Sequence, residues 1–145
     1  MDKTAEKTKH NEATRFLTAS CGCGGLKITV SGDPAGVYAC ACLECQRATG
    51  SGFSYRARFP KAAISSIDGE RRSWRRNGEA GRWVEQTFCP TCGALVYMEG
   101  EAIPGAVVIS VGCFADKAFT PPAALYWASR RHAWYVPAEQ TRLVD

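Results

Sequence analysis

The sequence has no long apolar run. No stretch of its 145 residues is hydrophobic for the length that a membrane-spanning helix requires, and no apolar segment follows the charged residues at 1–12. We therefore expect no membrane association, no secretory signal and a cytoplasmic location. Internal repeats and low-complexity blocks are also absent, which excludes repeat architectures.

Strong charge of one sign is missing as well. The 18 basic and 14 acidic side chains give a net charge of only +4, which is small for a protein that binds phosphate backbones. The charge therefore favours a small anionic ligand over nucleic acid. The arginines gather near two tryptophans, where they could hold carboxylates or could form a solvated hairpin edge. These residues are Arg71, Arg72, Arg75, Arg76 and Arg82, with Trp74 and Trp83.

Cysteine, by contrast, is abundant, with eight residues in close-spaced clusters. A C-x-C or C-x-x-C turn supplies two sulfurs from one ordered loop, which is the pattern of thiolate metal sites. Eight cysteines could also form a disulfide framework, but in a reducing compartment clustered thiols favour metal binding. Four cysteines in one ferredoxin-type run are absent, so zinc is expected, with iron as the alternative. The clusters are Cys21-Gly22-Cys23, Cys40-Ala41-Cys42-Leu43-Glu44-Cys45 and Cys89-Pro90-Thr91-Cys92, with Cys113 alone.

The spacing divides the clusters into two candidate zinc sites. The middle three cysteines are too close together to serve two ions, so they form one three-sulfur group. The outer two turns then combine into a closed four-sulfur site, which is typical of a structural zinc. The expected structural ligands are Cys21, Cys23, Cys89 and Cys92, and the expected catalytic ligands are Cys40, Cys42 and Cys45.

The three-cysteine group raises the question of its fourth ligand. Three protein ligands with one open position are typical of a catalytic zinc. Alternatively, Cys113 or His132 closes the site, or the group is redox-active or empty. Three thiolates leave a net negative charge on the zinc site, which makes a bound water a poor acid. An incoming thiol suits the open position better, because bound sulfur loses its proton and stays nucleophilic.

The hydrophobic pattern predicts one mainly β domain at 16–145, preceded by a flexible tail at 1–15. Apolar residues alternate or cluster in five expected strands. A short helix is expected at 43–49, closed by Gly50 in a left-handed conformation, with its N-terminal amides facing the thiolates. The expected strands are 26–30, 53–59, 83–88, 95–98 and 107–111.

The motifs resemble those of the glutathione-dependent formaldehyde-activating family. They are C-x-C-G at 21–24, C-x-C-x-x-C-x-R-x-x-G at 40–50, F-C-x-x-C-G at 88–93 and G-x-x-x-D at 112–116, followed by Trp127 and Trp134. The resemblance implies an Mss4-like fold with several coiled antiparallel sheets around a structural zinc. It also implies a second, catalytic zinc on Cys40, Cys42 and Cys45, with glutathione as co-substrate. Ala41, Gln46 and Cys113 depart from the family pattern, which bears on the substrate more than on the zinc sites.

The combined expectation is a zinc-dependent carbon–sulfur lyase that activates a glutathione-like thiol for reversible addition to formaldehyde or a related aldehyde. Arg47, two residues after Cys45, is the expected ligand-binding residue beside the three-cysteine group. Phe53 and Tyr55 could wall the same cavity, and His132 and Trp134 could line its mouth. The rival hypothesis is a non-catalytic, zinc-stapled binding module for a protein or a small thiol.

Overall fold

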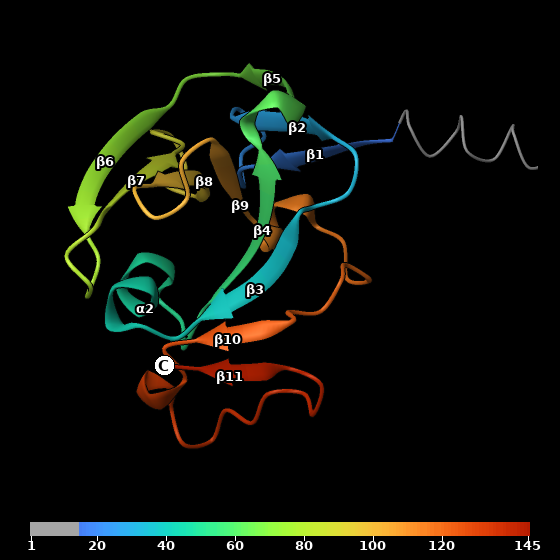
Figure 1. Ribbon diagram of the computed structural model, residues 1–145. Helices are drawn as coiled ribbons and strands as arrows, with labels where there is room; N and C mark the ends of the chain where they lie inside the picture. The colour runs from blue at the N-terminus through green and yellow to red at the C-terminus, as the bar shows by residue number, and fades with distance from the viewer. Residues whose placement is uncertain (1–14) are drawn as a thin grey trace, which may run out of the picture.

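The computed structural model describes residues 15–145, so residues 1–14 of the expected tail lie outside the described part of the chain. Eleven strands in the described part form two sheets, with one short α-helix (Figure 1). The smaller sheet has the order β1-β2-β5, formed by β1 (Phe16–Ser20), β2 (Lys27–Ser31) and β5 (Ile64–Asp68). The expected mainly β fold with a short helix is confirmed.

The larger sheet has eight strands in the order β11-β10-β3-β4-β9-β8-β7-β6. Its pairs are antiparallel, except that the three-residue β10 runs parallel to both β3 and β11. The purely antiparallel expectation is corrected at this edge, where the chain returns from a long connection after β9. The strands are β11 (Arg142–Val144), β10 (Ala124–Tyr126), β3 (Gly36–Cys40), β4 (Ser54–Pro60), β9 (Ala106–Ser110), β8 (Leu95–Gly100), β7 (Trp83–Phe88) and β6 (Arg72–Asn77).

The remaining elements are short. Helix α2 (Leu43–Thr49) lies between β3 and β4 and ends at Gly50, whose φ of 63° is left-handed, as expected. Single turns of 3₁₀ helix follow β4, β9 and β10, as η1 (Lys61–Ala63), η2 (Val111–Phe114) and η3 (Ala128–Arg130). No helix within residues 15–145 is long and apolar enough to cross a membrane.

The main core lies where the two sheets face each other. Ile28 and Val30 of the small sheet share one buried cluster with Phe59, Val107 and Ile109 of the large sheet. Each of these five side chains is fully buried, which contributes about 1.5–3 kcal/mol per residue to stability. The alternation seen in the sequence follows from this arrangement, because one face of each strand is turned toward the core.

The β3-α2-β4 segment positions the middle cysteines. Strand β3 ends at Cys40, which pairs with Ser54 of β4, and Tyr38 pairs with Arg56. Directly paired residues project from the same face of a sheet, so Tyr38, Cys40 and Arg56 share one face. The large sheet curls, so that the tip of the β6–β7 hairpin lies near α2 although β6 and β3 are far apart in strand order (Figure 1).

Candidate metal centres and the cavity beside them

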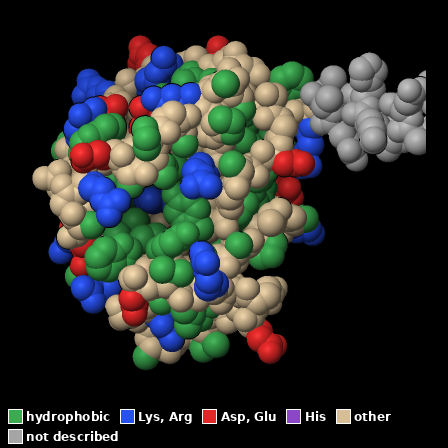
Figure 2. All heavy atoms as spheres, viewed as in Figure 1, with side chains coloured by type: hydrophobic (Ala, Val, Ile, Leu, Met, Phe, Trp, Pro, Cys, Tyr) green, Lys and Arg blue, Asp and Glu red, His purple; other side chains and the backbone are tan. Residues whose placement is uncertain are grey.

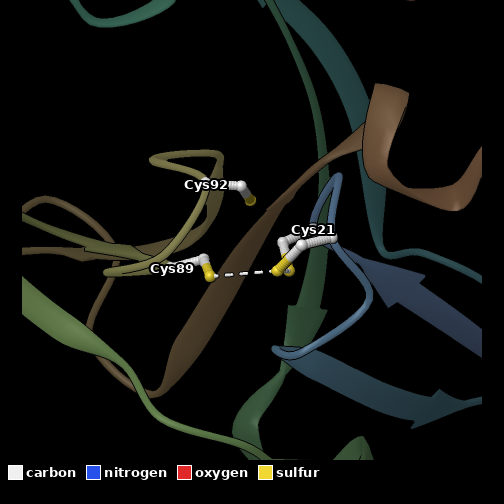
Figure 3. A group of neighbouring side chains, drawn as sticks. Cys21, Cys89 and Cys92 are labelled. Carbon is white, nitrogen blue, oxygen red and sulfur yellow. Dashed lines mark hydrogen bonds between the residues drawn. The ribbon is translucent and has the colours of Figure 1, made fainter.

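The outer cysteines come together into a four-sulfur cluster, as the sequence predicts. Cys21 and Cys23 follow β1, whereas Cys89 and Cys92 lie in the turn between β7 and β8, and their sulfurs lie within 4.8 Å of one another. The Cys23 sulfur lies 3.6 Å from those of Cys21 and Cys89. Figure 3 shows Cys21, Cys89 and Cys92 turned toward a common space. A tetrahedral zinc with Zn–S bonds of about 2.3 Å implies sulfur separations of about 3.8 Å, which this cluster fits.

Backbone amides prepare the four-sulfur cluster for negative charge. The N–H of Leu26 donates to Cys21 Sγ at 3.1 Å and lowers the pKa of this thiol. A hydrogen bond from the N–H of Ala94 lowers the pKa of Cys92 to about 6. The second turn requires Gly93, which has a φ of 77° and donates its N–H to Cys89 O at 2.8 Å. The hydrogen bonds from Leu26 N–H and Ala94 N–H to sulfur favour thiolates, the form that binds metal.

The middle cysteines form a second, fully buried cluster. The sulfurs of Cys40, Cys42 and Cys45 lie within 4.8 Å of one another, and within the described residues no histidine or carboxylate joins this group. Cys42 also caps α2, because its sulfur accepts the N–H of Cys45 at 3.3 Å. Contact with the Cys40 and Cys42 thiols lowers the pKa of Cys45, whereas contact with Cys42 and Cys45 raises that of Cys40. The cluster therefore loses its first proton easily, and a cation is needed to stabilise three thiolates.

The three-cysteine group opens onto a cavity of about 540 Å³, within the range of about 300–1,000 Å³ found for small-ligand sites. All three cysteines line it. Tyr38 and Arg56 form the sheet side, the tip of the β6–β7 hairpin forms the opposite wall, and Trp127 packs against the three cysteines. Figure 2 shows this face of the molecule hollowed, with basic and hydrophobic side chains around the depression.

Arg56 and Arg76 are the buried charged residues of the cavity wall, and of the two Arg56 lies beside the cysteines. Its side chain is only 8% exposed, and its Nε and Nη2 have no hydrogen-bond partner among the described residues. Burial opposes its charge, but the neighbouring Cys45 and Tyr38 groups hold its pKa above the ordinary value. Burial raises the pKa of Tyr38, and the nearby Arg56 charge offsets only part of this rise. The phenol therefore stays protonated at neutral pH.

Three candidate residues from the sequence lie away from the three-cysteine group. Arg47 does not line the cavity, because it forms an ion pair with Glu44 on the exposed face of α2, and Arg56 takes the position beside the thiols. Cys113 does not close the three-cysteine group. Its thiol donates to Leu95 O at 3.6 Å and packs in the main core, where burial and then the nearby Cys21 and Cys92 groups raise its pKa. His132 instead contacts Gln46, with Nε2 3.1 Å from Oε1.

The other aromatic candidates pack elsewhere. Phe53 stacks on Tyr135 at 4.4 Å, and the Tyr55 hydroxyl donates to the Thr120 carbonyl. Trp134 is 72% exposed and stacks on His132. None of these side chains lines the cavity beside the three-cysteine group.

The arginine-rich segment divides between the two uses that the sequence left open. Arg76 and Arg82 line the cavity, and Arg76 Nε donates to Gln86 Oε1 at 2.6 Å. Arg75 instead lies over the Trp83 ring at 4.0 Å and pairs with Glu85. One end of the β6–β7 hairpin therefore faces the cavity, and the exposed residues of β6 form a solvated edge of the sheet.

Sequence reasoning gave several residues of the cavity wall no role in the site. Tyr38, Arg56 and Glu79 belong to no motif, and Trp127 was noted only as part of the family pattern. The available signal was the alternation at 53–59, where Arg56 occupies a polar position of an otherwise buried strand. An alternating arginine ordinarily faces solvent, and only the curl of the sheet shows that this face is enclosed.

The fold and its clusters define a mainly β protein with two all-cysteine sites suited to metal. The sequence matches the family described as glutathione-dependent formaldehyde-activating enzyme over residues 16–130. The chain belongs to this family, which confirms the resemblance found from the motifs. No curated protein matches the sequence. The crystal structure of a Rhodobacter sphaeroides protein has the same fold, with a TM-score of 0.55 and 18% identity over 72% of this chain and 92% of the other.

Proposed function

We propose that this chain is a zinc-dependent carbon–sulfur lyase of the S-(hydroxymethyl)glutathione synthase type. It activates a glutathione-like thiol for reversible addition to formaldehyde or a related small aldehyde. Membership of the formaldehyde-activating family supports the reaction class. The observation that carries the proposal is the opening of three buried sulfurs onto a cavity of small-ligand size.

Each cysteine cluster would hold one zinc ion. The four sulfurs of Cys21, Cys23, Cys89 and Cys92 complete a tetrahedral set, which suits a structural ion. Cys40, Cys42 and Cys45 supply three, one fewer than tetrahedral zinc takes, which suits a site that also binds substrate. When bound there, zinc supplies Lewis acidity that lowers the pKa of a substrate thiol and keeps its sulfur nucleophilic at neutral pH.

The chain's own residues would stabilise the charge that this chemistry requires. The Cys45 N–H donates to the Cys42 sulfur, and the Arg56 guanidinium places a positive charge beside the cluster. Trp127 packs against the three cysteines and shields one side of them from solvent. A drier site strengthens each of these interactions.

Tyr38 is placed to serve the aldehyde oxygen. In the addition, a carbon–sulfur bond forms, the carbonyl π bond breaks, the thiol proton leaves, and the oxygen gains a proton. Tyr38 lines the same cavity and is protonated at neutral pH, so its hydroxyl can donate a hydrogen bond or a proton to that oxygen. The thiol proton, released through water, restores the phenol.

The test combines metal counting with an exchange assay. Native mass spectrometry of the full chain counts zinc, and ¹³C-formaldehyde exchange spectroscopy with glutathione measures the interconversion of free and thiol-bound formaldehyde. We expect two zinc ions and faster exchange for the wild type, one zinc and uncatalysed exchange for Cys42→Ser, and wild-type behaviour for Cys113→Ser. A two-zinc protein that neither binds glutathione nor speeds exchange would overturn the proposal in favour of a zinc-stapled binding module.

A further inference from the structure

The cavity beside the three cysteines adjoins a second, smaller cavity of about 190 Å³. The residues that line both are Tyr38, Arg56, Arg82, Val84 and Ala102, so the Arg56 side chain lies at the boundary between the two. The far end of the smaller cavity is apolar. The apolar residues that line only this cavity are Trp83, Met98, Ile103 and Val108.

Arg56 at this junction has unused hydrogen-bonding capacity. A buried guanidinium with two unpartnered nitrogens is costly, because each donor has left water without replacing its hydrogen bonds. The acidic residues nearby are engaged elsewhere. Glu79 accepts from Leu43 N and contacts Arg130, and Asp145 accepts from Ser129 N at 2.7 Å.

The acidic residue at the apolar end is engaged as well. Glu99 pairs with Lys61, with 3.0 Å between Lys61 Nζ and Glu99 Oε2. A guanidinium fork matches a carboxylate, which can accept two parallel hydrogen bonds. Among residues 15–145 Arg56 therefore has no carboxylate partner, and the anionic group that acts on it is the Cys45 thiolate. Its unpartnered nitrogens face a space large enough for a ligand carboxylate.

We propose that Arg56 anchors the carboxylate of a ligand whose apolar part occupies the cavity walled by Trp83, Met98 and Val108. This inference rests on the proposed function, because it concerns the substrate of the same site. The substrate class is a thiol, or the adduct of a thiol, that carries a carboxylate next to an apolar group. Glutathione supplies carboxylates but no large apolar group. A carboxylate with an aryl or branched alkyl group uses both ends of the cavity.

Binding of probes without a thiol tests this assignment independently of zinc chemistry. Isothermal titration of the zinc-loaded full chain compares 3-phenylpropionate with propionate, which lacks the ring, and with 3-phenylpropanol, which lacks the charge. We expect 3-phenylpropionate to bind about 10-fold or more tightly than either, since charge-assisted hydrogen bonds and ring burial each contribute at this level. Equal affinity for the alcohol would overturn the role of Arg56, and equal affinity for propionate would overturn the apolar subsite.

Variants then identify the arginine. Arg56→Gln should weaken 3-phenylpropionate about 10-fold or more, and Arg56→Lys should recover part of the loss because it keeps the charge without the fork. Arg58→Gln is the matched control, because Arg58 lies two residues along the same strand and lines a different cavity. Unchanged affinity in Arg56→Gln, or equal losses in both glutamine variants, would overturn the proposal. The wild-type probe comparison decides the question if Arg56→Gln does not fold.

A thiol probe separates this inference from the proposed function. Binding of 2-mercaptoethanol, which has no carboxylate, reports on the three-cysteine site alone. Loss of 2-mercaptoethanol binding in Cys42→Ser, with 3-phenylpropionate binding retained, supports separate roles for the two ends. If 2-mercaptoethanol does not bind the wild type while 3-phenylpropionate does, the thiol-activating function fails and the carboxylate site stands.

Discussion

Glu79 and Leu43 join two parts of the chain that are far apart in the large sheet. Glu79 Oε2, at the tip of the β6–β7 hairpin, accepts the backbone N–H of Leu43 at 3.2 Å. Leu43 is the first residue of α2, which carries Cys45 and is capped by Cys42. Glu79 Oε1 also contacts Arg130 Nε at 3.3 Å. The hairpin wall of the cavity is therefore held against the helix that presents the thiols.

Removal of this contact should loosen the cavity without unfolding the protein. For Glu79→Ala we expect a loss of unfolding free energy of no more than about 1 kcal/mol, because the interacting groups are partly exposed. Hydrogen exchange of the Leu43 amide should accelerate, and thiol affinity should fall several-fold. Glu85→Ala on the same hairpin, which removes only the contact with Arg75, is the control. Slow Leu43 exchange in Glu79→Ala would contradict the prediction.

Cys42 has two roles that a pair of substitutions can separate. Serine is a good helix N-cap but a poor zinc ligand, whereas alanine is neither. Cys42→Ser should therefore lose one zinc and keep α2, and Cys42→Ala should lose one zinc and a further ~1 kcal/mol of stability. Native mass spectrometry and chemical denaturation measure the two effects. Equal stabilities of the two variants would show that the cap contributes nothing.

The four-sulfur cluster should be needed for folding rather than chemistry. Its ligands join the turn after β1 to the turn between β7 and β8, so metal binding and folding are coupled. Cys89→Ser, or zinc removal by a strong chelator, should lower the unfolding free energy by more than about 4 kcal/mol. Cys113→Ser should keep both zinc ions, because its thiol bonds to Leu95 O. A stable, folded Cys89→Ser variant without its zinc would refute the structural role.

Gly69 should tolerate no side chain. Its φ is +102°, and a Cβ there would lie 1.7 Å from the carbonyl oxygen of Gly25, in the segment that follows Cys23. Gly69→Ala should therefore cost more than about 3 kcal/mol by thermal or chemical denaturation. Gly81→Ala is the matched case, with a φ of +81° and open space around the new methyl group, and should cost about 1–2 kcal/mol. Similar losses in both variants would mean that the close approach to Gly25 is relieved.

Local patterns predicted the central strands because their burial is regular. Alternation over 26–30 and 53–59 corresponds to β2 and β4, and the continuous apolar run at 107–111 overlaps β9. The edge strands carry less of this signal. β6 is rich in arginine and mostly exposed, and its strand conformation comes from pairing with β7. The three-residue β10 and β11 likewise depend on their neighbours.

The cysteines of the site could be assigned to groups from spacing because each pair comes from one tight turn. The cavity could not be predicted from spacing, since its walls come from segments that meet only when the large sheet curls. Cys113 illustrates the limit. It was a candidate fourth ligand of the middle group, but η2 follows β9 at the end nearer to Cys21 and Cys92. The position of a single residue relative to a distant cluster depends on topology, which spacing does not encode.

The reacting end of the cavity and the walls that select its occupant belong to different parts of the chain. The segment from β3 through α2 to β4 carries Cys40, Cys42, Cys45 and Arg56. The opposite wall comes from the β6–β7 hairpin tip and the loop after β8. Glu79 apart, which bonds to Leu43 of α2, substitutions in those two loops leave the segment that carries the thiols in place. Under the proposed function, such a division would let a lineage exchange one aldehyde or thiol for another around the same cysteines, so we expect relatives to diverge in these loops first.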